Sequence, residues 1–296
     1  MDLIGHHKIK NFIDEVCKKG TYSHAYLFVG PKNIGKSTFG KYLGQKLLCG
    51  EEKAPCGKCL DCRLSEVGNH PDLLVSDSEE AIGIDEVREL IHFLELKPYR
   101  AKVKVALITH FERLSVPSAN ALLKTLEEPA ANTVLVITAE SIQNVLPTII
   151  SRTQVVRFSG MKKGQIAEEL KKSGFVEDDV NRALNLSGDR IGRTLELCLN
   201  PEKIKENEEY LKKMDWNLFE SRLHEKILFA ESFDRKKEDL GGGLDLLEVY
   251  YESKLKSEDT LKYCIILDKI AKSKDRLNRN GNARMIIESL LFDNAK

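Results

Sequence analysis

One glycine-rich segment near the N-terminus restricts the fold of this chain more than any other part of the sequence. Residues 30–37 fit the pattern Gly-x-x-x-x-Gly-Lys-[Ser/Thr], with an apolar run of strand character at 24–30 before it and a helical pattern after it. In this order of strand, loop and helix, backbone N–H groups and a helix N-terminus face the same phosphate group. We therefore expect a phosphate-binding loop. Its candidate nucleotide-binding residues are Gly30, Gly35, Lys36, Ser37 and Thr38.

Strand and helix signals alternate through the first half of the chain. Short extended runs rich in apolar residues lie at 72–75, 103–109 and 133–138. Patterns with helical spacing of apolar residues lie between them, at 84–96 and 119–127. Alternation of this kind predicts an α/β domain in which a parallel sheet is flanked by crossover helices.

The second half of the chain reads as helical. Past about residue 158 the strand signals end, and breaks near Gly174, Gly188 and Asn200 separate helical patterns. The three consecutive glycines at 241–243 are predicted to form a loop inside the last domain. A chain of 296 residues is too long for one compact core. We expect three domains: 1–159 with the phosphate loop, a small helical domain at 160–205, and a helical C-terminal domain at 206–296.

Composition excludes several classes of protein. Lys plus Arg and Asp plus Glu both number 46, so the net charge is zero at pH 7. A protein that holds DNA alone needs a basic excess, so any contact with nucleic acid is expected to be shared or local. No signal-peptide pattern and no run of 18 uninterrupted apolar residues is present. We therefore expect a soluble, cytoplasmic protein with no role at a membrane.

Four of the seven cysteines lie close together, in a module at 49–62. Cys49, Cys56, Cys59 and Cys62 are separated by six, two and two residues. In a reducing compartment this spacing indicates a metal site rather than disulfides. Four thiolates complete a tetrahedral Zn²⁺ site and leave no coordination position open, so the predicted zinc is structural. The remaining cysteines are predicted to be buried thiols: Cys17, Cys198 and Cys264.

The strand expected to carry the catalytic carboxylates of a P-loop ATPase lacks them. In such enzymes this strand ends in Asp, which holds Mg²⁺, and a neighbouring carboxylate activates water. Here the run at 105–108 continues into Thr109 and His110. A threonine hydroxyl adds no negative charge, and His110 is a poor substitute for the glutamate that acts as the base. Glu112 is the rival base, two positions further along. We therefore predict no hydrolysis, with ATP or ADP as candidate ligands of the loop.

Several segments together resemble the bacterial clamp-loader AAA+ family, over essentially the whole chain. Besides the phosphate loop and the cysteine module, the similar segments are 24–28, 84–88, 97–99, 120–129, 146–154 and 280–284. The resemblance implies an AAA+ P-loop domain with an inserted zinc module. It further implies that 160–205 is a helical lid domain and that 206–296 is a collar domain through which subunits assemble.

The resemblance also implies a role for one arginine. The Ser-Arg-Cys signature of the family is present as Ser151-Arg152-Thr153, and the arginine is its working group. Arg152 is thereby expected to be an arginine finger that acts in trans, at the γ-phosphate held by a neighbouring ATPase subunit. By the same resemblance Arg193 is the candidate sensor arginine, with Arg190 as the alternative.

Within this family, the missing carboxylates favour a stator subunit over the gamma and tau motors, which keep their acidic motif. The implied partners are gamma or tau, delta, the sliding clamp (beta) and primer–template DNA, within the DNA polymerase III holoenzyme. The alternative is an autonomous AAA+ ATPase of the gamma/tau type, with His110 or Glu112 as its base. A third reading, a DNA-binding zinc finger, lacks the basic recognition helix that it needs, having only Lys53, Lys58 and Arg63 nearby.

Overall fold

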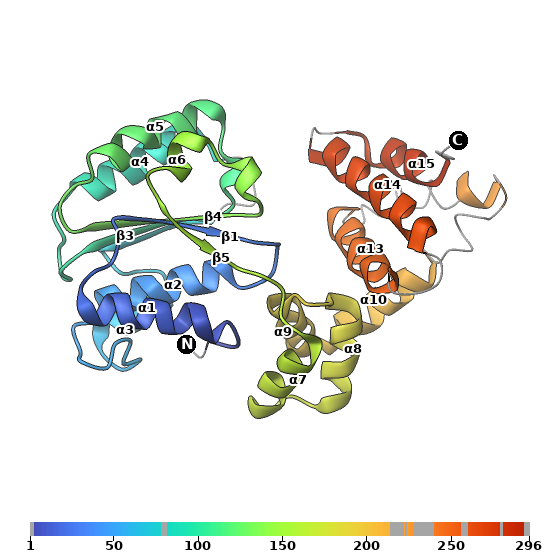
Figure 1. Cartoon of the computed structure of the whole chain (residues 1–296), viewed down its shortest axis with the longest axis horizontal. Coiled ribbons are helices and arrows are strands. Elements are labelled where there is room, and N and C mark those ends of the chain that lie inside the picture. Colours follow the sequence, from blue (N-terminus) through green and yellow to red (C-terminus); the bar gives the residue numbers. More distant parts are fainter. Residues whose placement is uncertain are drawn as a thin grey trace. The chain divides into compact units, whose positions relative to one another are not determined.

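The computed structural model describes residues 3–77, 82–213, 222, 224–227, 240–255, 260–278 and 281–292. The chain divides into two compact units (Figure 1). The first unit comprises Met1–Met161 with Arg190–Gly192, and the second comprises Lys162–Asp189 with Arg193–Lys296. Parts of the predicted collar domain, including Asn280 of the segment 280–284, lie outside the described residues. The domain boundary expected near residue 205 stays a prediction.

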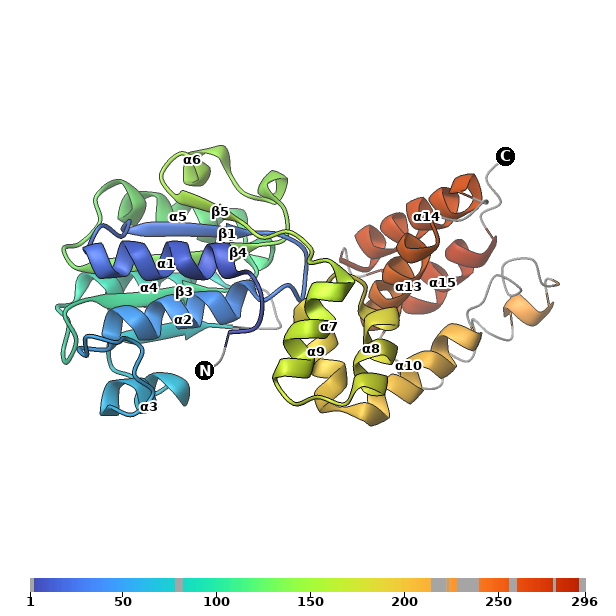
Figure 2. The same ribbon diagram turned by 60° about the horizontal axis from the view of Figure 1, so that its bottom comes forward.

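A parallel sheet forms the centre of the first unit, in the order β2-β3-β4-β1-β5. Its strands are β1 (Ala25–Val29), β2 (Leu73–Ser76), β3 (Lys104–Ile108), β4 (Thr133–Ala139) and β5 (Gln154–Arg157). Figures 1 and 2 show α1 and α2 on one face of the sheet and α4 and α5 on the other. The helices of this unit are α1 (His7–Lys19), α2 (Lys36–Leu48), α3 (Leu60–Glu66), α4 (Ile84–Glu95), α5 (Val116–Glu127) and the short α6 (Pro147–Ile150). The predicted α/β fold class is confirmed.

Each central strand is buried on both faces, which explains its continuous apolar sequence. Because successive side chains of a strand point to opposite faces, β1 contributes to two cores. Leu27 and Val29 pack in the core that contains residues of α4 and α5. Tyr26 and Phe28 pack in the core that contains residues of α1 and α2. The sheet is thus held from both sides, and the loop after β1 leaves a rigid strand.

The second unit is helical, as predicted. Its described residues contain no strand, and α8 packs against α7, α10 and α13. A separate apolar core lies within α13, α14 and α15. The helices are α7 (Lys163–Lys172), α8 (Glu177–Ser187), α9 (Ile191–Leu199), α10 (Pro201–Lys213), α13 (Leu240–Lys254), α14 (Thr260–Asn278) and α15 (Ala283–Phe292).

Two predictions are wrong, one about the glycines of this unit and one about the scattered cysteines of the chain. The glycines at 241–243 lie in the first turn of α13 rather than in a loop. A β-carbon added to Gly243 would overlap the ring and hydroxyl of Tyr210 on α10, so this glycine leaves room for the tyrosine side chain. Cys264 is exposed and Cys17 is half-buried, so of the three scattered cysteines only Cys198 is a buried thiol.

Within the described part of the chain, no helix combines the length and the apolar character needed to cross a membrane.

One buried carboxylate ties together the edge of the sheet. Asp72, which precedes β2, is fully buried and accepts hydrogen bonds from the backbone N–H groups of Tyr99, Arg100 and Ala101 at 2.6, 2.7 and 2.8 Å. The Lys104 ammonium lies 3.6 Å from it. Burial opposes the charge of Asp72, but these N–H groups and Lys104 outweigh burial and lower its pKa. The carboxylate therefore fixes the loop between α4 and β3.

We expect Asp72→Asn to lower the free energy of unfolding by about 2–3 kcal/mol, because it weakens several charge-assisted hydrogen bonds at once. Amide hydrogen exchange of Tyr99, Arg100 and Ala101 should accelerate. Since folding depresses the pKa of Asp72, its stabilisation is present above the unfolded pKa of about 4 and is lost as the pH falls through the folded value.

The matched control is Asp85→Asn, because Asp85 is 88% exposed and, among the described residues, forms an ion pair with Arg88 of its own helix. We expect it to change the free energy of unfolding by less than about 0.5 kcal/mol. Equal effects of the two variants in urea unfolding would contradict the anchoring role of Asp72.

Candidate functional site

The phosphate loop connects the end of β1 to the start of α2, as the sequence predicts. Gly35 has φ 101°, a left-handed conformation that glycine adopts without strain. At the other end of the loop, a β-carbon on Gly30 would collide with the backbone of Phe158, which follows β5. Both glycines of the motif are therefore required by the backbone, and Ser37 and Thr38 lie in the first turn of α2.

Lys36 lies inside the loop. Its side chain is buried, and Nζ donates hydrogen bonds to the carbonyl oxygens of Gly30 and Pro31 at 2.6 and 2.7 Å. Burial lowers the pKa of Lys36 to about 8, although the charge of Glu112 acts against this shift. The ammonium is thus held at the point where a phosphate would meet the loop.

The two residues that follow β3, Thr109 and His110, carry no carboxylate, and both side chains are turned toward acidic neighbours. Thr109 is fully buried, and its hydroxyl donates to Asp77 Oδ1 at 2.7 Å. This hydroxyl also lies 3.2 Å from the carbonyl oxygen of Ser76, so it is directed toward β2. His110 has a left-handed backbone, with φ 56°, and its Nδ1 lies 3.2 Å from Glu112 Oε1.

Two glutamates lie together beside these residues. Glu112 Oε2 accepts a hydrogen bond from the backbone N–H of Glu140 at 3.3 Å, and Glu140 pairs with Lys32 at 3.3 Å. Burial opposes the charge of Glu112, but the hydrogen bonds from His110 and from backbone N–H groups lower its pKa. Burial raises the pKa of Glu140, with Lys32 opposing the shift and Glu112 adding to it. One ligand atom from each of His110, Glu112 and Glu140 lies within 4.8 Å of the others, a spacing that could hold a cation.

Glu140 was not among the residues expected from the sequence. It directly follows β4, the neighbour of β3, and parallel strands end at the same edge of a sheet. Glu140 lies two positions after the end of the predicted strand at 133–138, so a search for polar residues near the strand ends was the available signal. The structure thus brings both rival bases, His110 and Glu112, into one cluster with Glu140.

Arg152 lies on the surface, two residues after α6. Its Nη1 donates to the carbonyl oxygen of Thr148 at 2.9 Å and to Ser151 Oγ at 3.1 Å. Nη2 pairs with Glu127 Oε1 at 2.7 Å. The side chain remains 34% exposed. The guanidinium is therefore both held in place and accessible from outside.

The two candidate sensor arginines are both buried. Arg190 groups with the unit that carries the phosphate loop, whereas Arg193, in α9, groups with the helical unit. The assignment of Arg193 as the sensor, with Arg190 as the alternative, stays a prediction.

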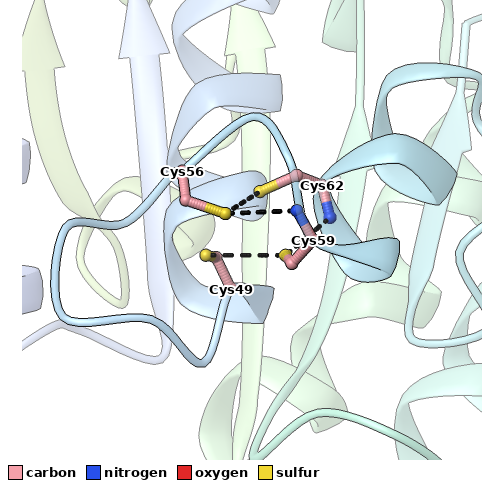
Figure 3. Close-up of side chains that lie close together, drawn as sticks. All are labelled: Cys49, Cys56, Cys59 and Cys62. Atoms are coloured by element: carbon pink, nitrogen blue, oxygen red, sulfur yellow. Dashed lines mark hydrogen bonds between the residues drawn. The ribbon is translucent and has the colours of Figure 1, made fainter.

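The four module cysteines converge, as predicted from their spacing (Figure 3). Cys49 Sγ lies 3.9 Å from Cys59 Sγ, and Cys56 Sγ lies 3.9 Å from Cys62 Sγ. These distances exclude disulfides, whose sulfurs are about 2.05 Å apart. Four sulfurs around Zn²⁺ with Zn–S bonds of about 2.3 Å would be about 3.8 Å apart. The module therefore fits one tetrahedral Zn²⁺.

Local backbone geometry prepares these thiols. Cys59 caps α3, and its Sγ accepts a hydrogen bond from the backbone N–H of Cys62. The N–H groups of Lys58 and Cys59 point at Cys56 Sγ and lower the pKa of that thiol to about 6. Burial, in contrast, raises the pKa of Cys62. A bound cation would allow all four thiols to be thiolates together.

The module is tied to the sheet through Asp61 in α3. Its carboxylate accepts a hydrogen bond from Arg100 Nε at 2.9 Å and lies 3.3 Å from Nε2 of the buried His70. Nδ1 of His70 accepts the backbone N–H of Asp72 at 3.0 Å. That bond places the imidazole proton on Nε2, which donates to Asp61. Arg100 lies in the loop that Asp72 fixes.

Comparisons with known proteins identify the family of this chain. A family model described as "DNA polymerase III, delta subunit" matches residues 5–162, more than half of the chain. DNA polymerase III subunit delta′ of Bacillus subtilis (strain 168) is 29% identical over 308 residues, which covers 93% of this chain and 92% of that protein. The chain belongs to the DNA polymerase III delta-prime family.

This member of the delta-prime family is also similar to a second relative and to a solved structure. DNA polymerase III subunit delta′ of Pseudomonas aeruginosa (strain PAO1) is 40% identical over 139 residues, but this alignment spans only 45% of this chain and 42% of that protein. A solved structure of a RuvB mutant from Thermotoga maritima has a TM-score of 0.50 and 13% identity, with 98% of this chain and 87% of that chain covered. The second likeness shows the fold alone.

We expect chelator-free purification to give about one equivalent of zinc per chain by elemental analysis, because the four sulfurs already have the spacing of a tetrahedral site. Cys59→Ser should lose most of this metal, since the change replaces a thiolate ligand by a hydroxyl, while serine can still cap α3. Cys264→Ser, at an exposed cysteine outside the module, should retain it. Metal-free wild-type protein with four freely titratable module thiols would remove zinc from the account of this module.

Proposed function

We propose that this chain is a clamp-loader subunit that does not hydrolyse ATP itself and that donates Arg152 to the ATP site of a neighbouring gamma or tau subunit. In this role it acts in the cytoplasm as a stator. It assembles with gamma or tau and with delta, and helps to place the beta sliding clamp on primer–template DNA during replication.

The observation that carries this proposal is the end of β3. Mg²⁺ in P-loop ATPases is held by an Asp at this point, and a neighbouring carboxylate orients water. Thr109 directs its hydroxyl toward Asp77 instead, and His110 is turned toward Glu112. Two required negative charges are therefore missing from their usual places, although the loop itself retains Lys36 and Ser37.

Arg152 is the residue that this chain would contribute to the reaction of its neighbour. An arginine finger stabilises the charge that spreads over the oxygens of the transferred phosphoryl group. Arg152 is accessible and its planar guanidinium can contact two oxygens at once. A chain with an incomplete site of its own can in this way complete the site of its neighbour.

Two ligands belong to the same proposal. The phosphate loop is proposed to hold ATP or ADP without hydrolysis, through Gly30, Gly35, Lys36, Ser37 and Thr38. The cysteine module is proposed to hold a structural Zn²⁺. Neither ligand performs chemistry in this chain, which contributes one charge to the reaction of another subunit.

The second candidate function is an autonomous AAA+ ATPase of the gamma/tau type. It is favoured by one observation, the cluster of His110, Glu112 and Glu140. The charges of Glu112 and Glu140 reach the ammonium of Lys36, where each opposes the lowering of its pKa by burial. A cation held by these residues would stand in for the Mg²⁺ site that β3 lacks.

The isolated chain is expected to show no Mg²⁺-dependent ATP hydrolysis, with turnover far below about 1 per second, the low end of ordinary enzymes. A turnover of that order, abolished by Lys36→Ala, would support the autonomous ATPase instead. In that case Glu112→Gln would separate a glutamate base from one provided by His110. The measurement is release of inorganic phosphate by purified wild type and the two variants.

In a reconstituted loader, Arg152→Ala is expected to depress hydrolysis stimulated by DNA and clamp, and to impair clamp loading. Fingers of this kind contribute roughly a thousandfold at one site. Only the site that faces this subunit loses its finger, so the fall in total hydrolysis is partial and loading is the sharper measurement. Arg152→Lys should rescue poorly, because an ammonium cannot bridge two oxygens as the planar fork does.

The matched control for this experiment is Arg157→Ala, at an exposed arginine of β5. Both alanine variants should fold, keep their zinc and co-purify with gamma or tau, delta and the clamp, because exposed arginines contribute little stability. Normal assembly together with wild-type clamp loading by Arg152→Ala would return Arg152 to the status of an ordinary surface arginine.

A further inference from the structure

Arg152 already has an anionic partner within its own chain. Glu127, the last residue of α5, pairs with Nη2 at 2.7 Å. The opposite Nη is held by the carbonyl oxygen of Thr148 and by Ser151 Oγ. The guanidinium is thus fixed from two elements, α5 and the α6 segment, which pack against each other.

This ion pair is placed to be exchanged. The side chains of Arg152 and Glu127 are 34% and 51% exposed, so an incoming phosphate can reach the guanidinium without unfolding anything. Ion pairs with this much exposure are weak, whereas a phosphate carries more charge and offers two oxygens to the planar fork. A carboxylate at 2.7 Å also cancels part of the positive potential that a distant phosphate would experience.

We propose that Glu127 is a positioning residue that holds Arg152 in the free chain and gives it up to the γ-phosphate of a neighbouring, ATP-loaded subunit. This inference rests on the proposed function of Arg152. No covalent bond changes: the ion pair between Arg152 and Glu127 breaks, and one between Arg152 and the phosphate forms. Glu127 therefore competes with ATP for the finger and lowers the preference of this chain for an ATP-loaded neighbour over an ADP-loaded one.

The test measures that preference. The full chain is titrated against the purified gamma subunit loaded either with a non-hydrolysable ATP analogue or with ADP, and the ratio of the two Kd values is recorded. Glu127→Gln removes the competing charge at nearly constant shape, so the ratio should shift toward the ATP-loaded state by roughly 1.5- to 5-fold, the range of exposed ion pairs. Glu127→Asp, whose shorter side chain reaches the guanidinium less well, should lie between wild type and Glu127→Gln.

The matched control is Glu128→Gln, which removes the same charge from the next residue, also exposed. It should leave the ratio within about 1.5-fold of wild type, since net charge alone acts weakly across a surface at physiological salt. In an Arg152→Ala background, Glu127→Gln should have no effect, because a competitor without its target changes nothing.

The outcomes separate this inference from the function on which it rests. If Arg152→Ala lowers the preference for the ATP-loaded neighbour but Glu127→Gln leaves it unchanged or lowers it, Glu127 does not restrain the finger and only this inference is overturned. If Arg152→Ala itself leaves the preference unchanged, the finger and the inference are both overturned. An equal shift with Glu128→Gln would reduce the effect to net charge and also overturn the role of Glu127.

Discussion

Parallel backbone pairing of the five strands is the constraint on which the rest of the first unit depends. Because β1, β3 and β4 run in the same direction, their carboxyl ends lie along one edge of the sheet. The residues that follow these strands, Gly30, Thr109 and Glu140, come from distant parts of the sequence and are delivered to that edge. Burial of both faces under helices keeps the strands rigid, so the positions of these groups are set by the sheet rather than by the loops.

This edge carries a mixed electrostatic environment. Lys36 provides a positive charge under a glycine loop, which suits phosphate, but the usual carboxylates at the end of β3 are absent from Thr109 and His110. Glu112 and Glu140 place negative charge nearby, balanced in part by Lys32. The loop and its lysine are thus kept, while the negative charges at this edge lie on Glu112 and Glu140 rather than on the two residues that follow β3.

The sequence predicted best those features that depend on local geometry. The loop at 30–37 and the spacing of the four cysteines each specify a structure through neighbouring residues, and both are found as expected. Features that depend on contacts across the fold were missed or misread. The strand β5 is only four residues long and its outer residues are exposed, so it gave no apolar run. The glycines at 241–243 suggested a loop, because the side chain for which Gly243 leaves room, Tyr210, lies in another helix and is not evident from the local sequence. Glu140 required knowledge of which strands are neighbours.

The hydrogen bonds of Asp61 connect the cysteine module to the loop that leads into β3. Asp61 accepts a hydrogen bond from the side chain of Arg100, and Asp72 accepts one from the backbone N–H of the same residue. His70 connects the Asp61 carboxylate, through Nε2, to the backbone N–H of Asp72, through Nδ1. A local opening of the module would therefore release one of the two attachments of the loop that leads into β3. In terms of cooperativity, these bonds couple the module, the loop and the sheet edge, so a local opening of one is felt by the others.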